Sequence, residues 1–191
     1  MKIAVRPLTP ERWPDLETIF GARGCSVARG CWCMYYRNSG RTPLPAGLTR
    51  SQANRKALRA LVRKDPPPGL IGYRGREPVG WVSLGPRADY RKLGRSFVMK
   101  AVDDKPVWSV ICFVVPAEFR SQGVAKALLE GAIKYAKRKR VRILEAYPVD
   151  KRERSADDTL WFGTKSMFDA AGFVEVARRK PRRPVVRLAL S

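Results

Sequence analysis

A short segment combines the features that proteins use to hold a phosphate group. It reads Pro116-Ala117-Glu118-Phe119-Arg120-Ser121-Gln122-Gly123-Val124-Ala125 and lies between an apolar run and an amphipathic run. The first turn of a helix presents unpaired N–H groups and about half a positive charge. Arg120 adds a full charge, and Gly123 lacks the Cβ that would keep a phosphate from the backbone. The segment predicts a pyrophosphate site, although it also fits an ordinary strand-helix turn.

The histidine and cysteine content narrows the chemistry further. The chain has no histidine, which excludes a histidine base, a Ser-His-Asp triad and a haem histidine. Its four cysteines are Cys25, Cys31, Cys33 and Cys112. Structural zinc sites use four ligands in closely spaced pairs, a spacing that the three neighbouring cysteines do not have. The pattern favours no metal site: it indicates thiols packed in a loop beside aromatic residues, with Cys112 as a small core residue.

The segments around the turn predict the elements that position it. Residues 107–115 are the longest apolar run and rich in β-branched residues, which predicts a central strand buried on both faces. Apolar or small residues recur at helical spacing from 124 to 135, which predicts a long amphipathic helix. Further strands are expected at 3–8, 70–73, 79–84, 142–147, 173–177 and 185–190, with helices near 13–20, after a cap at Ser51, and at 166–171. These elements predict one α/β domain, residues 1–191, with a mixed sheet and helices on both faces.

The strand, turn and helix resemble the acetyl-CoA-binding motif of the GNAT superfamily of N-acyltransferases, in which a central strand leads into R/Q-x-x-G-x-G/A and a long helix. Arg120, Gly123 and Ala125 fill this motif, and the order of expected elements is similar over most of the chain. The resemblance implies a GNAT-like α/β (α+β) fold with a mostly antiparallel sheet, and acetyl-CoA as co-substrate. The run Cys31-Trp32-Cys33-Met34 is similar to a feature of one bacterial subgroup.

The resemblance also implies which residues hold the cofactor. The central strand and the next one would splay apart so that the cofactor arm fits between them. The backbone of Phe113, Val114 and Val115 would then hydrogen-bond the pantetheine arm and the acetyl carbonyl. The pyrophosphate would lie on Arg120, Ser121, Gln122, Gly123, Val124 and Ala125.

Catalysis of amine acetylation requires a neutral amine and a proton for the departing CoA thiolate. Members of the family often supply this proton from a tyrosine at the place where this chain has Phe168, which is expected to pack against the thioester instead. Glu145 and Tyr147 share one face of the splayed strand. They are our candidates for base and acid. Two alternatives stay open: both residues have only packing or ion-pair roles, or positioning suffices and water transfers the protons.

The loop from Gly24 to Arg41 is expected to form one wall of the acceptor site, because GNAT-like proteins admit the amine from the side of the first two helices. Trp32 and Tyr35 would supply stacking surface for the acceptor. The alternative is a hydrophobic plug that covers the sheet.

The charge of the chain predicts attraction to polyanions, because Lys and Arg outnumber Asp and Glu by 39 to 17 and the net charge is +22. Basic residues gather at 134–142, 151–154 and 178–183. The predicted function is transfer of an acetyl group from acetyl-CoA to a primary amine by direct attack in a ternary complex. The alternative is a basic nucleic-acid-binding module, or an acetyltransferase acting on an RNA-borne acceptor.

The cellular location and partners follow from the same patterns. The sequence has no long apolar run and no signal-peptide core, which predicts a cytoplasmic protein without a membrane partner. An acidic partner and a homodimer both stay open.

Overall fold

The centre of the molecule is one sheet, seen in a computed structural model that describes residues 2–38, 43–150 and 161–190. Its strands are β1 (Ile3–Pro7), β2 (Gly69–Arg74), β3 (Glu77–Pro86), β4 (Trp108–Val114), β5 (Ile143–Ala146), β6 (Val174–Arg178) and β7 (Pro184–Ala189). Their order is β1-β2-β3-β4-β5-β7-β6. Only the pair β4 and β5 is parallel among these strands. The predicted mixed, mostly antiparallel sheet is confirmed.

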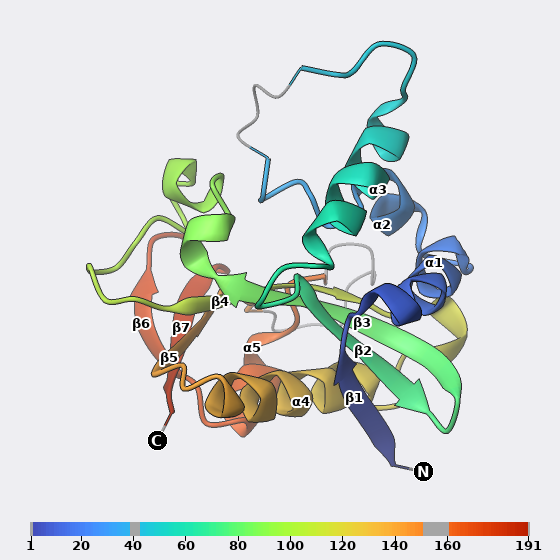
Figure 1. Cartoon of the computed structure of the whole chain (residues 1–191). Coiled ribbons are helices and arrows are strands. Elements are labelled where there is room, and N and C mark those ends of the chain that lie inside the picture. Colours follow the sequence, from blue (N-terminus) through green and yellow to red (C-terminus); the bar gives the residue numbers. More distant parts are fainter. Residues whose placement is uncertain (1, 39–42, 151–160, 191) are drawn as a thin grey trace.

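Helices cover both faces of this sheet (Figure 1). They are α1 (Trp13–Gly21), α2 (Ser26–Cys31), α3 (Arg50–Leu61), α4 (Val124–Arg138) and α5 (Lys165–Ala170). The first three lie on one face, whereas α4 and α5 lie on the other. Within the described residues, no helix is long and apolar enough to cross a bilayer.

The start of α3 differs from the prediction. Thr49 is its N-cap: the Thr49 hydroxyl accepts from the Gln52 amide, and the Gln52 side chain accepts from the Thr49 amide. This reciprocal capping box satisfies two backbone donors. The prediction that Ser51 caps the helix was wrong, because its hydroxyl instead donates to the Arg29 carbonyl at 2.7 Å and ties α3 to α2.

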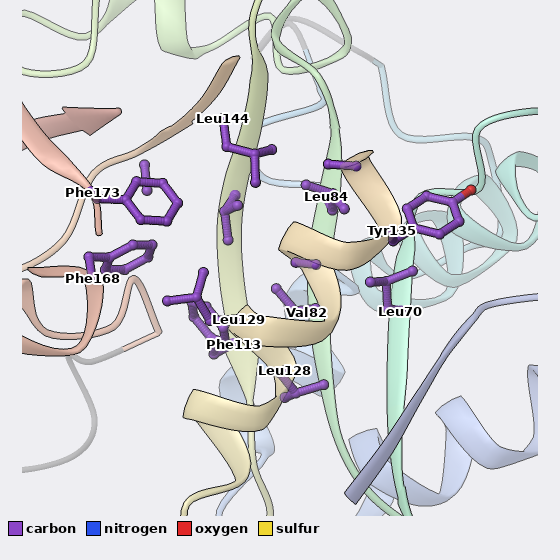
Figure 2. Packing of buried hydrophobic residues seen from close by; sticks show 14 of the residues in the cluster. Leu70, Val82, Leu84, Phe113, Leu128, Leu129, Tyr135, Leu144, Phe168 and Phe173 are labelled. Atoms are coloured by element: carbon purple, nitrogen blue, oxygen red, sulfur yellow. The ribbon is translucent and has the colours of Figure 1, made fainter. Parts of the chain in front are cut away.

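The long helix α4 packs closely on the sheet (Figure 2). Leu128 and Leu129 are buried against β3 and β4. A Cβ added at Gly131 would lie 2.4 Å from the Cβ of Val5, so only glycine lets the helix backbone approach β1 this closely. This contact fixes the height of α4, and therefore of the turn before it, above the sheet.

The pairing of β4 with β5 is short. It joins Trp108 to Leu144, Ser109 to Glu145 and Val110 to Ala146, and then ends. The remainder of β4 continues to Val114 and stays paired with β3 on its other edge. The two strands therefore part after Val110, as the resemblance implies.

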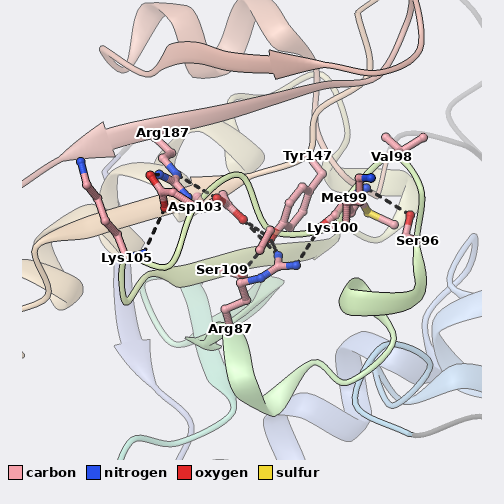
Figure 3. Close-up of polar contacts among 12 residues, drawn as sticks. Arg87, Ser96, Val98, Met99, Lys100, Asp103, Lys105, Ser109, Tyr147 and Arg187 are labelled. Carbon is pink, nitrogen blue, oxygen red and sulfur yellow. Dashed lines mark hydrogen bonds and ion pairs between the residues drawn. The ribbon is translucent and has the colours of Figure 1, made fainter.

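Residues 86–105 form a largely irregular insertion between β3 and β4 and are held to the sheet by a buried polar network (Figure 3). Glu145 is 0% exposed. Its carboxylate accepts hydrogen bonds from Arg87 at 3.1 Å, Arg187 at 2.8 Å and Tyr147 at 2.6 Å. Arg187 also pairs with Asp103 at 2.7 Å. Because Arg87 and Asp103 belong to the insertion, one buried carboxylate connects it to β5 and β7.

Replacement of the central carboxylate should therefore destabilise the fold. The change Glu145→Gln keeps the shape of the side chain and removes the charge that both arginines contact. Breaking a buried ion pair from one side costs about 3–5 kcal/mol, so we expect the free energy of unfolding in urea to fall by about that amount. The matched change Glu175→Gln affects a surface pair with Arg178 and should cost less than about 1 kcal/mol. Equal effects would contradict a structural role for the network.

Candidate active site

A cavity of about 730 Å³ opens where β4 leaves β5. Its walls come from segments that are far apart in the sequence: parts of 24–36, the end of β4 at 112–115, the turn and first residues of α4 at 119–126, and parts of 161–167. The cavity thus joins the predicted phosphate turn to the loop between α1 and α3. Cavities of this size hold small ligands or cofactors.

The turn before α4 has the backbone geometry of an anion site. Gly123 is the N-cap with φ +79°, and Ser121 is also left-handed at φ +58°. No side chain caps the helix, and no acidic residue lies in its first turn. A Cβ at Gly123 would meet no atom within 4 Å. The first amides of α4 consequently lack a side-chain acceptor and adjoin open space, which suits a phosphate.

Arg120 lines the cavity and holds two parts of its wall together. Its Nε donates to the Val115 carbonyl at 3.1 Å, and one Nη donates to the Gly24 carbonyl at 2.7 Å. Gln122 behaves differently. Its amide group accepts from Arg74 and donates to the Glu118 carbonyl, and Gln122 is not part of the cavity lining, unlike the other predicted residues of the turn.

The end of β4 and the residue after it line the cavity through Phe113, Val114 and Val115. The Phe113 amide donates to the Trp161 carbonyl at 2.7 Å, so this backbone donor has a protein partner in the described structure. Phe168, which was expected beside the cofactor, is 0% exposed and packs edge-on against Phe113 and Phe173. It lies behind the cavity wall, while Met167 and Thr164 reach the cavity instead.

The loop after α2 has some residues in the core and others in the cavity wall. Trp32 is 5% exposed and packs between Trp13 and Phe20, with ring centroids at 5.8 and 5.0 Å. Its indole N–H donates to Ser51. Tyr35 is 56% exposed and lines the cavity. The structure thus places Tyr35 where an acceptor wall is expected and Trp32 in the core, as in the plug alternative; the loop beyond residue 38 lies partly outside the described residues.

Glu145 and Tyr147, our candidates for base and acid, are both 0% exposed and do not line the cavity. Glu145 is held by two arginines. Burial and the neighbouring carboxylate raise the pKa of the Tyr147 phenol, whose hydroxyl is bonded to Glu145 and Ser109. The two side chains share a face, as the spacing predicts, but the polar network that they form does not line the cavity.

The sequence analysis did not single out several residues that do line the cavity. All four cysteines and Tyr36 are among them. Burial raises the pKa of Tyr36 to about 12, so its phenol keeps its proton at neutral pH. The alternation of β4 could have indicated Cys112, because it shares a face with Val114. No sequence signal would have shown that the loop brings Cys33 to the same place.

Comparisons with known proteins agree with this geometry. The model of the acetyltransferase (GNAT) family matches residues 32–157. Among solved structures, the PaiA N-acetyltransferase of Thermoplasma acidophilum in complex with coenzyme A has a TM-score of 0.55 at 17% identity, with 99% of each chain covered.

Two further structures are similar to the same degree. An N-acetyltransferase of Staphylococcus aureus Mu50 has a TM-score of 0.55 at 16% identity over 100% of both chains. The polyamine N-acetyltransferase of Drosophila melanogaster has 0.53 at 13% identity, covering 99% of this chain and 100% of that one. At these identities the likeness shows the fold. No curated protein matches the sequence significantly.

The position of Trp32 leads to a stability test. Trp32→Ala removes a buried indole and should lower the free energy of unfolding by roughly 3–5 kcal/mol, measured by thermal or urea unfolding. The matched change Tyr35→Ala removes an exposed ring from the neighbouring cavity wall and should leave stability nearly unchanged. A selective rise in the Michaelis constant for an amine in Trp32→Ala, with unchanged melting temperature, would instead assign Trp32 to the acceptor wall.

Proposed function

We propose that this chain, which belongs to the GNAT family of acetyltransferases, transfers the acetyl group of acetyl-CoA directly to a primary amine in a ternary complex. Membership makes it an acetyl-CoA-dependent N-acetyltransferase. The observation that carries the direct-transfer proposal is that one cavity connects the predicted phosphate turn with the exposed residue Tyr35. Both substrates then share one space. Because every described strand belongs to one sheet, the whole chain is proposed as one domain.

The cofactor would enter with its pyrophosphate on the turn and its arm along the end of β4. The uncapped amides of α4 and the side chains of Arg120 and Lys126 supply positive potential at the turn. The arm would run toward the point where β4 leaves β5, beyond Val110 and Ala146. There the apolar wall excludes water, which strengthens the polarisation of the thioester carbonyl by backbone donors.

The acceptor would approach past Tyr35. Its nitrogen lone pair attacks the thioester carbonyl carbon, the C–N bond forms, and the C–S bond to CoA breaks. The nitrogen then loses one proton, and the departing sulfur takes one. No carboxylate lines the cavity among the residues that the structure describes. The amine therefore reacts as the neutral species taken from solution, and its proton leaves to water.

Tyr36 is the proposed proton donor to the CoA sulfur. It lines the cavity, packs edge-on against Phe162 at 5.6 Å, and its hydroxyl has no hydrogen bond to another described residue. Burial, which raises the pKa of the phenol, also raises the pKa of a thiol leaving in the same cavity. The phenol therefore still carries its proton when the sulfur leaves, and the buried thiolate is the stronger acceptor for that proton.

A polyanionic acceptor is the second candidate, and the charge on α3 favours it. Residues 50–64 carry Arg50, Arg55, Lys56, Arg59, Arg63 and Lys64 and no acidic residue. This helix contacts α2, whose residues line the cavity. An RNA-borne amine could therefore reach the cavity while phosphates contact α3. The basic cluster at 134–142 lies at the end of α4, and the one at 151–154 falls outside the described residues. Measurement of the acetylation rate at several salt concentrations distinguishes an RNA-borne amine from a small amine as the acceptor.

The cofactor site is tested by a charge placed on the turn. Gly123→Val is unsuitable because a β-branched residue is strained at φ +79°. Ser121 lies at φ +58°, which Asp and Asn tolerate. Ser121→Asp should weaken acetyl-CoA binding at least about tenfold by repelling the pyrophosphate, whereas the isosteric Ser121→Asn should bind like the parent. Calorimetry at two salt concentrations measures both. Equal affinities of the two variants would place the pyrophosphate elsewhere.

Substitution of each of two neighbouring tyrosines tests the proposed proton donor. Tyr36→Phe should lower kcat about 100-fold where proton transfer limits, with unchanged affinity for acetyl-CoA, while Tyr35→Phe should keep the parental rate. Since the pKa of Tyr36 is raised to about 12, the phenol stays protonated below that pH. The parental kcat/KM should therefore rise with pH as the amine loses its proton and show no falling limb up to pH ~10.5. A Tyr36→Phe variant with parental kcat would remove Tyr36 as the donor.

A further inference from the structure

The cavity wall at Tyr35 and Tyr36 continues directly into a buried arginine. Both tyrosines line the cavity, and the next residue, Arg37, is 8% exposed. Arginine is rarely buried to this extent unless specific partners hold its charge. The partners of Arg37 therefore show what fixes this part of the cavity wall.

The guanidinium of Arg37 connects its loop to the insertion at 86–105. One Nη donates to the Asp89 carboxylate at 3.3 Å, and the other donates to the Tyr90 hydroxyl at 2.9 Å and to the Pro68 carbonyl at 3.2 Å. The guanidinium carbon also lies 4.3 Å from the centre of the Tyr90 ring. Asp89 and Tyr90 belong to the insertion, whereas Pro68 directly precedes β2. Arg37 thus joins the cavity wall to two other segments.

Burial of this charge opposes folding. The side chain of its carboxylate partner, Asp89, is 49% exposed, and the Nε atom of Arg37 has no hydrogen-bond partner among the residues that the structure describes. A buried ion pair often stabilises a fold no better than apolar residues of the same volume, and its better supported contribution is to specify one geometry. This favours a role of Arg37 in placing the segment over a role in stability.

Two further contacts hold the tyrosines to the same insertion. The Lys92 amide donates to the Tyr36 carbonyl at 3.1 Å, and the Lys92 ammonium lies 3.6 Å from the centre of the Tyr35 ring. The two tyrosine rings meet edge to face at 4.9 Å. Beyond Arg37, the Asn38 amide group donates to the Asn54 side chain of α3 at 3.2 Å. Both ends of the segment are consequently held.

The insertion can hold this wall because it is itself anchored in the core. The amides of Tyr90 and Leu93 donate to carbonyls three residues earlier, at 3.0 and 2.9 Å, so these residues form tight turns. Arg87, at the start of the turns, donates to the buried carboxylate of Glu145 at 3.1 Å. The insertion therefore bridges the buried network on β5 and the cavity wall.

We infer that Arg37 is a positioning residue for acetyl transfer, and that it acts by holding the Tyr36 phenol where the CoA sulfur leaves. The inference rests on the proposed function, in which Tyr36 donates the proton. A proton donor must lie within hydrogen-bond reach of its acceptor, and a misplacement of about 1 Å can lower a rate about 100-fold. Arg37 does not line the cavity, so it acts through Tyr36 rather than on a substrate.

Hydrogen–deuterium exchange of the full-length protein tests the holding of the segment without any turnover. Arg37→Met replaces the guanidinium by an apolar chain. The peptide covering residues 34–38 should then exchange at least about tenfold faster, with unchanged exchange in α4. The matched change Arg179→Met removes an arginine that binds three carbonyls at residues 98–101 of the insertion, and this peptide should exchange as in the parent. Parental exchange of the peptide in Arg37→Met would overturn the inference.

A double-mutant comparison with acetyl-CoA and tyramine tests the action through Tyr36. Arg37→Met should lower kcat at least about tenfold, while the affinity for acetyl-CoA stays within about twofold. In the Tyr36→Phe background the same change should alter kcat less than about twofold, because no donor remains to be displaced. Arg179→Met should keep the parental kcat. A loss of equal size in both backgrounds indicates a merely structural effect and would overturn the inference, as would a parental kcat in Arg37→Met.

Asp89→Asn carries both tests if Arg37→Met speeds exchange throughout the protein. It removes the charge partner of Arg37 at a half-exposed position, which the fold should tolerate. The exchange rate of the peptide should rise, and kcat should fall, by about threefold each, and kcat should stay constant in the Tyr36→Phe background. Parental values of both would overturn the inference. A Tyr36→Phe variant with parental kcat would refute the proposed donor, whereas the exchange measurement would still report whether Arg37 holds the segment.

Discussion

The early end of the pairing between β4 and β5 is the constraint on which the functional half of the molecule depends. A parallel pair that stops after Val110 and Ala146 leaves the rest of β4 with one edge outside the ladder. Buried backbone groups need partners, and the Trp161 carbonyl supplies one to Phe113. The remaining opening is bounded by α4 below, the loop after α2 above and the start of α5 beside it. A ligand with a long polar arm fits such an opening because it can supply the missing hydrogen bonds.

On the side of β5 away from the cavity, the polar groups of the Glu145 network are instead bound to one another. Glu145 is dehydrated completely, and two guanidinium groups compensate its charge. Removing a carboxylate from water costs several kcal/mol, which only close, well-directed partners offset. The molecule thus separates a closed polar network, which anchors residues 86–105, from an open cavity with thiols and phenols.

The strand, turn and helix from 107 to 138 could be predicted because periodicity and helix-start chemistry are local properties. The separation of β4 from β5 was predicted from the family resemblance alone. The role of Glu145 could not be predicted, because spacing shows that it shares a face with Tyr147 but not that Arg87 and Arg187 cover that face. The place of Cys33 in the cavity wall depends on a left-handed turn at Trp32 and Cys33, which local propensity disfavours for non-glycine residues. Trp32 likewise lies in the core because of the same turn, which directs Tyr35 outward.

Arg120 joins the turn before α4 to the connection between α1 and α2 through the Gly24 carbonyl. One N–H group cannot serve this carbonyl and a phosphate oxygen at the same time. If a pyrophosphate draws the guanidinium to itself, as proposed, the connection at Gly24 loses one hydrogen bond, while the bond from the Ala117 amide to the Arg23 carbonyl remains. Linkage makes the relation reciprocal: whatever favours the released connection tightens pyrophosphate binding by the same factor. With the pyrophosphate bound as proposed, an acceptor that displaces this connection would show heterotropic cooperativity with the cofactor through Arg120.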